Sequence, residues 1–336
     1  MQMNIYELIK WLNINKRHID DSIIKKVYKT YKNGIILEIY KPGIEKRYLY
    51  LIPGKYVFLS NQKRNLESDQ FIMRLRKDFG GKRIKIDTLN FERVIVVSSN
   101  DSSNHLVIEL FSDGNIIVLD ENHIIKYAMF YKDYGIRKIA KGEEYKIPQS
   151  SFYLPNKYED FYNIIKNSDK KDIVRCLAID LKLGGKYSEE FLKLSSIEKT
   201  KKPQDLSEDD INKLFNLYSN FINHNNILYD GKWTQDIDQV FENVFLKEIE
   251  REDVLEIEKQ KYIKIMEDQK RILEEIERKI EENKKIGEFL MNYSWIFYDY
   301  DTDRIKKEFE KLNIDIEIKK DGRKIIIYLK NQYNQS

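Results

Sequence analysis

Residues 61–85 hold the densest set of side chains that could bind a ligand. They carry eight Lys or Arg against three Asp or Glu, a net of +5 in a chain whose formal total is +3. Arg74 and Lys77 are three residues apart on a helix predicted over 69–79, and Gly80-Gly81 follows, where backbone can approach a phosphate. The pattern indicates contact with nucleic-acid backbone, and the alternative is a solvated helix face.

A charged pair, Glu92-Arg93, interrupts the apolar run FERVIVVS, which predicts a strand over 91–98. Strand alternation would place the two charges on opposite faces, so that one of them faces apolar neighbours. A buried charge needs a partner or a functional role. The alternative is an edge strand whose charges lie in water.

Gly184-Gly185 lies between helices predicted over 170–182 and 187–194. A tight turn of this kind can present backbone N–H groups to a phosphate, as helix-hairpin-helix modules do. The alternative is a tight loop with no ligand.

Enzyme and metal signatures are missing from the sequence. One cysteine and four scattered histidines make neither a disulfide nor a zinc knuckle. Walker A, GxGxxG, GxSxG and HExxH motifs do not occur. We therefore expect a binding protein, not an enzyme, with no cofactor and no metal.

The sequence also argues against export and membrane insertion. Glu7 and Lys10 interrupt what would be the apolar run of a signal peptide. The longest uncharged stretch, 214–229, is polar and too short to cross a bilayer. No membrane partner is expected, and the predicted location is cytoplasmic.

Composition and periodicity predict an α+β chain of several domains. Hydrophobic residues make up 41% of the 336, enough for real cores, and 13 Gly with 5 Pro imply short connections. Strand-like runs between 23 and 129, with helices at 4–12 and 69–79, predict a mainly antiparallel domain. The expected divisions are an α+β domain at 1–153, a short-helix module at 154–235, a long helix at 236–293 and a small α/β tip at 294–336.

The long helix carries an apolar stripe with coiled-coil spacing. Its members recur at threes, fours and sevens between Lys and Glu: Leu255, Tyr262, Ile265, Ile272, Ile276, Ile280 and Leu290. A lone helix cannot cover such a stripe, so a second helix is expected against it.

Six segments in the first 200 residues resemble the NFACT family of ribosome-associated quality-control factors, of the RqcH and NEMF type. They are IIKKVYKTYKNGIILEIYKPG (23–43), FIMRLRKDFGGKRI (71–84), FERVIVV (91–97), LVIELFSDGNIIVLDEN (106–122), KGEEYKIP (141–148) and DIVRCLAIDLKLGGKYSEEF (172–191). Their order and spacing match through about residue 230, and the archaeal branch looks most similar.

The resemblance implies a fold and a role. The fold is a domain shaped like formamidopyrimidine-type DNA glycosylases, then a helix-hairpin-helix module, then a coiled coil. Members bind a stalled large ribosomal subunit that still carries peptidyl-tRNA, and recruit aminoacyl-tRNA for extension without a template. The ribosome makes the peptide bond, so the implied partners are the large subunit and tRNA.

The family's tRNA-recruiting Asp-Arg pair falls on Glu92-Arg93, with Glu in place of Asp. An early family Asp falls on Asn4, which loses the charge, so tailing is less firmly implied than ribosome binding. Arg76 and Lys77 match a family Arg-Lys block. The expected tRNA-binding residues are Asn4, Glu92, Arg93, Arg74, Arg76, Lys77, Lys82 and Arg83, with Gly184 and Gly185 as hairpin backbone.

The family has a second coiled-coil helix and a C-terminal RNA-binding domain, which this sequence lacks. We expect either a truncated form or a split gene whose second chain supplies both. The competing interpretation is a DNA-binding protein with a glycosylase-like fold. The chain begins Met1-Gln2-Met3, so the amino-terminal proline nucleophile of those glycosylases is absent.

Overall fold

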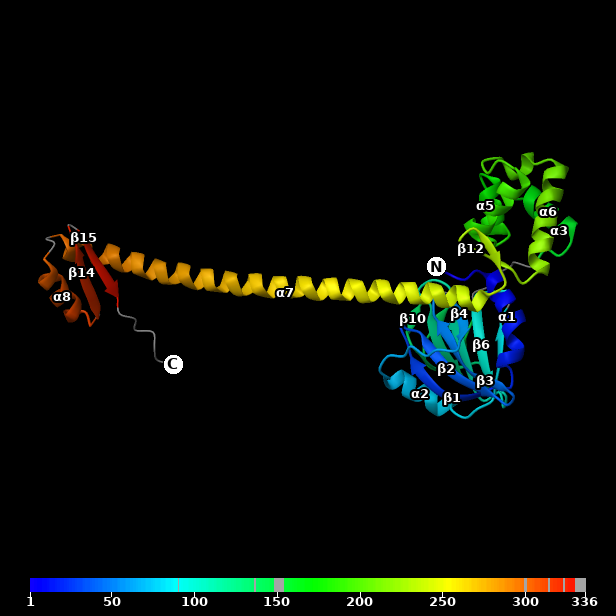
Figure 1. The fold of residues 1–336 in the computed structure, drawn as a ribbon, viewed down its shortest axis with the longest axis horizontal. Helices are drawn as coiled ribbons and strands as arrows, with labels where there is room; N and C mark the ends of the chain where they lie inside the picture. The colour runs from blue at the N-terminus through cyan, green and yellow to red at the C-terminus, as the bar shows by residue number, and fades with distance from the viewer. Residues whose placement is uncertain are drawn as a thin grey trace. The chain divides into compact units, whose positions relative to one another are not determined.

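Two antiparallel sheets form the centre of the N-terminal part of the chain (Figure 1). The structure is a computed structural model that describes residues 1–89, 91–135, 137–147, 154–298, 301–313, 315–322 and 324–329. Its contacts divide the chain into two units, Met1–Arg251 and Glu252–Ser336. The mixed α+β class expected from the sequence is confirmed. The finer division into four domains stays a prediction, and its boundary at 153 lies outside the described residues.

Each sheet is a meander of neighbouring hairpins. The first has four strands in the order β1 (Ile23–Lys29), β2 (Ile35–Lys41), β3 (Ile44–Ile52) and β4 (Tyr56–Ser60). The second has five, in the order β5 (Ile84–Thr88), β6 (Val94–Ser99), β7 (His105–Glu109), β8 (Asn115–Leu119) and β9 (Ile125–Ala128). Asn33-Gly34, a pair typical of hairpin turns, lies in the connection between β1 and β2, where Lys29 pairs with Ile35.

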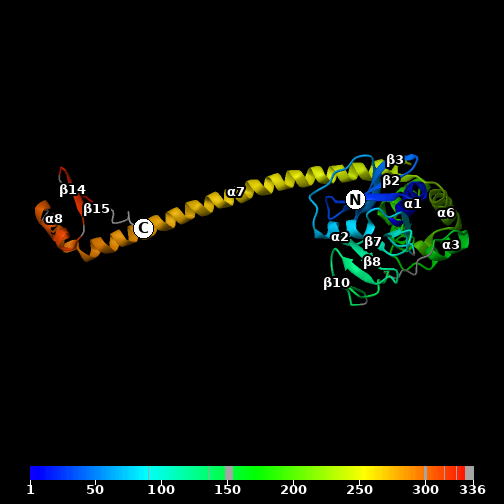
Figure 2. The same cartoon turned by 90° about the horizontal axis from the view of Figure 1, so that it is seen from below.

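Strand alternation gives the second sheet two buried faces. Leu106 and Ile108 face the main core, which the first sheet shares, whereas Val107 between them faces a smaller apolar cluster. That cluster includes Ile139 of a short hairpin, β10 (Lys132–Asp133) with β11 (Lys138–Ile139), which lies beside β8 (Figure 2). Sequence analysis did not anticipate this hairpin.

Helices α1 (Ile5–Ile19) and α2 (Gln70–Phe79) lie at opposite sides of these sheets (Figure 1). Asn4 and Glu7 form a capping box at the start of α1, and Asp69 caps α2. The helix predicted at 4–12 continues to Ile19, and its buried face continues with it, because Asn15 and Ile19 are also buried.

Short helices follow, as expected, although not all of them have the expected bounds. They are α3 (Tyr158–Lys166), α4 (Ile173–Arg175), a π-helical turn (Cys176–Asp180), α5 (Gly184–Ser195) and α6 (Glu208–Asn223). The predicted helix over 170–182 is wrong in its length. Gly184 and Gly185 do not link two helices but form the first turn of α5, preceded by Leu183. The helix-hairpin-helix assignment therefore stays a prediction.

The short hairpin β12 (Ile227–Tyr229) and β13 (Lys232–Thr234) leads into α7 (Ile237–Asn292), which matches the predicted long helix. Its first turns are anchored on the first sheet. The Asp238 carboxylate accepts hydrogen bonds from the Trp11 indole and the Leu59 amide, both at 2.7 Å, and burial raises its pKa. Phe245 packs on the rings of Tyr50 and Phe58.

The second unit ends in a small α/β tip. A 3-10 turn (Ser294–Phe297) and α8 (Thr302–Lys311) pack on a hairpin of β14 (Ile316–Asp321) and β15 (Lys324–Leu329), with Ile305 and Phe309 buried between them. Asp321 pairs with Lys324 at the turn of this hairpin. None of the described helices combines the length and apolarity needed to cross a bilayer.

Two glycine turns join the sheets backbone to backbone. The Gly54 amide between β3 and β4 donates to the Glu109 carbonyl at the end of β7, at 2.9 Å. A Cβ on Gly114, whose φ is +73°, would lie 1.9 Å from the Gly54 nitrogen. Only a residue without a side chain permits this approach.

Gly114→Ala should therefore lower the free energy of unfolding by about 2 kcal/mol or more beyond the matched change Gly142→Ala. Gly142 also has a positive φ, +85°, but nothing lies within 4 Å of its Cβ position, so it isolates the clash from the dihedral cost. Denaturant unfolding of the two variants measures the difference. Equal losses of stability would show that the turns can separate freely.

Candidate nucleic-acid interface

The start of α1 meets the start of α5 at a junction formed by residues far apart in the sequence. Asn4 accepts from the Glu7 amide at 2.9 Å, as an N-cap does, while its Nδ2 donates to the Leu183 carbonyl at 3.0 Å. An aspartate would cap α1 equally well but could not donate to Leu183. The asparagine is thus suited to this contact.

Glu92 and Arg93 lie in a turn, not in a strand. β6 begins only at Val94, and the preceding Phe91 has a φ of +57°. Phe91 packs edge-on against Tyr6 of α1, with ring centres 5.9 Å apart, which holds the turn against that helix. The strand predicted over 91–98 is confirmed from Val94 onward and wrong for residues 91–93, because Phe91 takes a left-handed conformation that alternation cannot reveal.

Both charges of this turn have partners in the junction. The Glu92 carboxylate pairs with Lys182 at 3.0 Å, just before α5. The Arg93 guanidinium donates to the Gln2 side chain at 3.2 Å and to the Met3 carbonyl at 3.3 Å. Partial burial lowers the pKa of Arg93. The charged pair is therefore half-buried and has hydrogen-bond partners. It is neither a charge buried on a strand face nor an edge-strand charge in water.

A buried carboxylate, Glu7, fixes the junction from inside. It is 1% exposed and accepts from the Tyr187 hydroxyl at 2.8 Å, from the Lys186 ammonium and from the Asn4 amide at 2.9 Å. These contacts hold the first turn of α5, where Gly185 is exposed, beside the first turn of α1. Two helix N-termini, each with a positive dipole end, thus lie close together.

The basic helix α2 forms a second candidate surface. Arg74 lies over the ring of Tyr127 in β9, and Arg76 lies over the ring of Tyr28 in β1, each with 5.9 Å from Cζ to the ring centre. Arg76 also donates to the Val27 carbonyl at 2.8 Å and to Ser68 at 2.7 Å. Arg76 therefore helps to attach α2 to β1.

Lys77 is exposed, and across the described ranges no ion pair joins it to another residue. Lys82 pairs with Asp101 at 3.3 Å, and Arg83 donates to the Asp21 carbonyl at 3.0 Å. Of the predicted basic contacts, Arg74, Lys77 and Arg83 are exposed, whereas Arg76 and Lys82 are partly buried. The structure thus separates the site residues into two groups: Asn4, Glu92, Arg93 and Gly184 at the junction, and the basic residues around α2.

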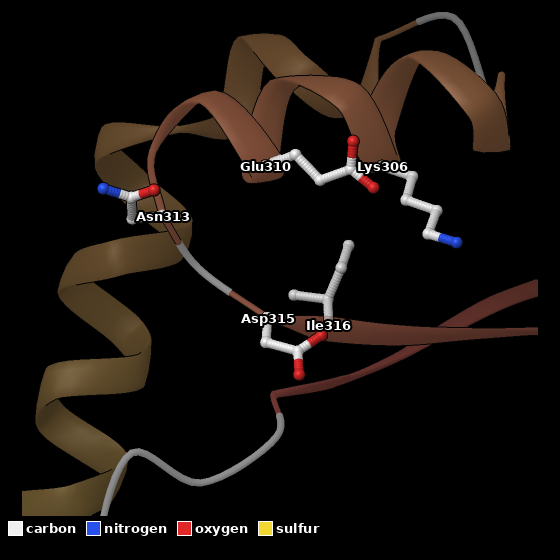
Figure 3. A pocket seen from close by; sticks show the side chains of 5 residues that line it. All are labelled: Lys306, Glu310, Asn313, Asp315 and Ile316. Atoms are coloured by element: carbon white, nitrogen blue, oxygen red, sulfur yellow. The ribbon is translucent and has the colours of Figure 1, made fainter.

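Groups suited to catalysis do not gather at either surface. Within the described residues no cluster of three or more His, Cys, Asp or Glu could hold a metal ion. A shallow pocket lies in the second unit, between α8 and β14, where Lys306 and Glu310 extend over Ile316 and Asp315 (Figure 3). Its lining mixes both charges and offers no aromatic surface.

Sequence reasoning missed Glu7, Lys182 and Lys186 as parts of the junction. Lys182 and Lys186 flank Gly184-Gly185, and that basic flank was a usable signal. Glu7 gave a local signal only, as the third residue of a capping box. Its contacts with residues about 180 positions away depend on tertiary packing.

Comparison with known proteins adds an independent line of argument. Residues 14–246 match the family described as NFACT N-terminal and middle domains. The archaeal Rqc2 homolog aRqcH of Methanocaldococcus jannaschii is 32% identical over 245 residues, which cover 68% of this chain and 34% of that relative. The chain thus spans about a third of the length of this curated relative.

Two solved structures share the fold. The N-terminal part of the fibronectin/fibrinogen-binding protein of Streptococcus suis gives a TM-score of 0.56 at 17% identity, covering 73% of this chain and 100% of that one. The fibrinogen-binding protein of Staphylococcus aureus gives 0.50 at 14% identity, covering 66% and 83%. Since the family match spans more than half of the chain and the archaeal relative is 32% identical over 68% of it, the chain belongs to the NFACT family of RqcH-type proteins.

Proposed function

We propose that this chain is a ribosome-associated quality-control factor that binds the large subunit with its peptidyl-tRNA and recruits aminoacyl-tRNA. The supporting observation is the junction, where Asn4, Glu92, Arg93 and the start of α5 come together from three distant segments. Charged and polar groups beside two helix N-termini are suited to reading a phosphate backbone and base edges. The basic helix α2 supplies a second set of phosphate contacts.

Cosedimentation with large subunits that carry peptidyl-tRNA tests the proposal. We expect the chain to pellet with these subunits, and sequencing of the bound RNA to show enrichment of particular tRNAs. Subunits without peptidyl-tRNA are the control. A chain that pellets with neither kind of subunit, or that binds duplex DNA as tightly as tRNA, would favour the alternative of a DNA-binding protein with the same fold.

The stripe on α7 is expected to bind a second helix. Its seven apolar members, from Leu255 to Leu290, are 42% to 64% exposed. Such a surface stays in water only at a cost of about 25 cal/mol per Å² of apolar area. A helix with matching heptad spacing, from whatever chain, would cover it.

Arg93→Ala should weaken tRNA binding about tenfold or more, because a charge-assisted hydrogen bond is lost, while leaving subunit cosedimentation unchanged. Gln2→Ala is the matched control, since it removes one partner of the guanidinium and keeps the cation. Filter binding with labelled tRNA measures the effect. A fall in melting temperature together with loss of all binding would instead identify Arg93 as a folding residue.

Charge reversal at Arg74 and Lys77 should weaken RNA binding and flatten its salt dependence. Each lost phosphate contact lowers the slope of log affinity against log salt by about 0.7 to 0.9. Reversal of Lys199 and Lys202, two exposed lysines in the connection between α5 and α6, changes the net charge equally. An unchanged slope in the Arg74 and Lys77 variant would exclude a phosphate role for α2.

A further inference from the structure

We propose that a cluster of cations around Tyr28, on the outer face of the first sheet, is a phosphate site for the backbone of an RNA. The inference rests on the proposed RNA-binding function but concerns residues outside the junction. Three elements supply the cations: Lys26 of β1, Lys63 of the segment after β4, and Arg76 of α2. The last of these was expected from the sequence to contact tRNA.

The cations converge on one ring. The Lys63 ammonium lies 4.2 Å from the centre of the Tyr28 ring, and the Lys26 ammonium lies 5.3 Å from it. The Arg76 guanidinium carbon is 5.9 Å away. The Tyr28 ring is 8% exposed and supports these cations through its π face.

Glu38 is the acidic partner within this group. It accepts from the Tyr28 hydroxyl at 2.7 Å and pairs with Lys46 at 3.8 Å. Burial and this carboxylate raise the pKa of Tyr28 to about 12, so the ring stays neutral. Because Glu38 is paired with Lys46, the three cations around the Tyr28 ring leave a net charge of +3, which a bound anion would neutralise.

Main-chain contacts fix Lys63 in place. The Tyr50 hydroxyl donates to the Gln62 carbonyl at 3.0 Å and accepts from the Arg64 amide at 2.8 Å, so the backbone on either side of Lys63 is held. Thr30 adds a hydrogen bond to the Arg64 carbonyl at 2.6 Å. Holding the backbone lowers the entropic cost of ordering this segment when a ligand binds.

The three cations differ in how many hydrogen-bond donors they have left for a ligand. Arg76 donates hydrogen bonds from its Nε to the Val27 carbonyl and from one terminal nitrogen to Ser68. Its guanidinium is therefore held in place and contributes mainly its positive charge. Lys26 and Lys63 are exposed, and each ammonium carries three donors that can reach a phosphate oxygen. The neighbouring Lys29 is paired with Asp69 at 2.8 Å and adds little net charge.

The test is the salt dependence of RNA binding by the full chain, with tRNA and a 20-nucleotide oligouridylate as probes. The double variant Lys26→Gln and Lys63→Gln should lower the slope by about 0.7 to 0.9 for each lost contact. Lys199→Gln with Lys202→Gln is the control of equal charge change and should leave the slope unchanged. An unchanged slope in the first variant would overturn the proposal.

A second variant, Glu38→Gln, should change RNA affinity in the opposite direction. Glu38→Gln keeps an acceptor for the Tyr28 hydroxyl but removes the carboxylate charge, so RNA affinity should rise about two- to fivefold. Weaker RNA binding by Glu38→Gln would contradict the proposal. So would a lysine double variant that loses binding to anionic phosphatidylglycerol vesicles but still binds RNA as before. Cosedimentation of the same variants with large subunits separates the phosphate site from the proposed function. Cosedimentation can fail while the salt slope of RNA binding still responds, and it can succeed while the slope does not.

Discussion

The buried carboxylate of Glu7 is the contact on which the arrangement of the first unit most depends. It accepts from the amide of its own N-cap, from a tyrosine hydroxyl and from a lysine ammonium, the last two on α5. Leaving such a group without partners costs about 3 to 5 kcal/mol, so α1 and α5 are held in one relative position. The placement of Asn4 against Leu183 and of Glu92 against Lys182 follows from that position.

Much of the fold could be predicted because its elements are locally consistent. Alternating strands, the turn at Asn33-Gly34 and the uninterrupted Lys/Glu-rich helix carry their signals within a few residues. The predictions fail where tertiary packing determines the backbone conformation. Phe91 takes a left-handed conformation because its ring packs on Tyr6, and Gly184 begins a helix that the glycine pair appeared to interrupt.

The candidate site could be predicted only in part, for the same reason. Sequence reasoning named residues of suitable charge but could not say which of them the fold uses for itself. Arg76 attaches α2 to β1, whereas its neighbour Lys77 is exposed. Lys63 belongs to the basic stretch 61–85, but its relation to Lys26 has no sequence signal, because it exists only where three elements meet over one tyrosine.

The long sequence separation of the α1 contacts has a consequence for synthesis on the ribosome. Tyr6 bonds to the Leu181 carbonyl and Lys10 to the carbonyl of His224, partners 175 and 214 residues further along the chain. At about 5 to 20 residues per second, the first helix emerges roughly ten seconds or more before these partners exist. Its polar face stays hydrated meanwhile, and closure of the junction is a late event that waits for the last short helix to be translated.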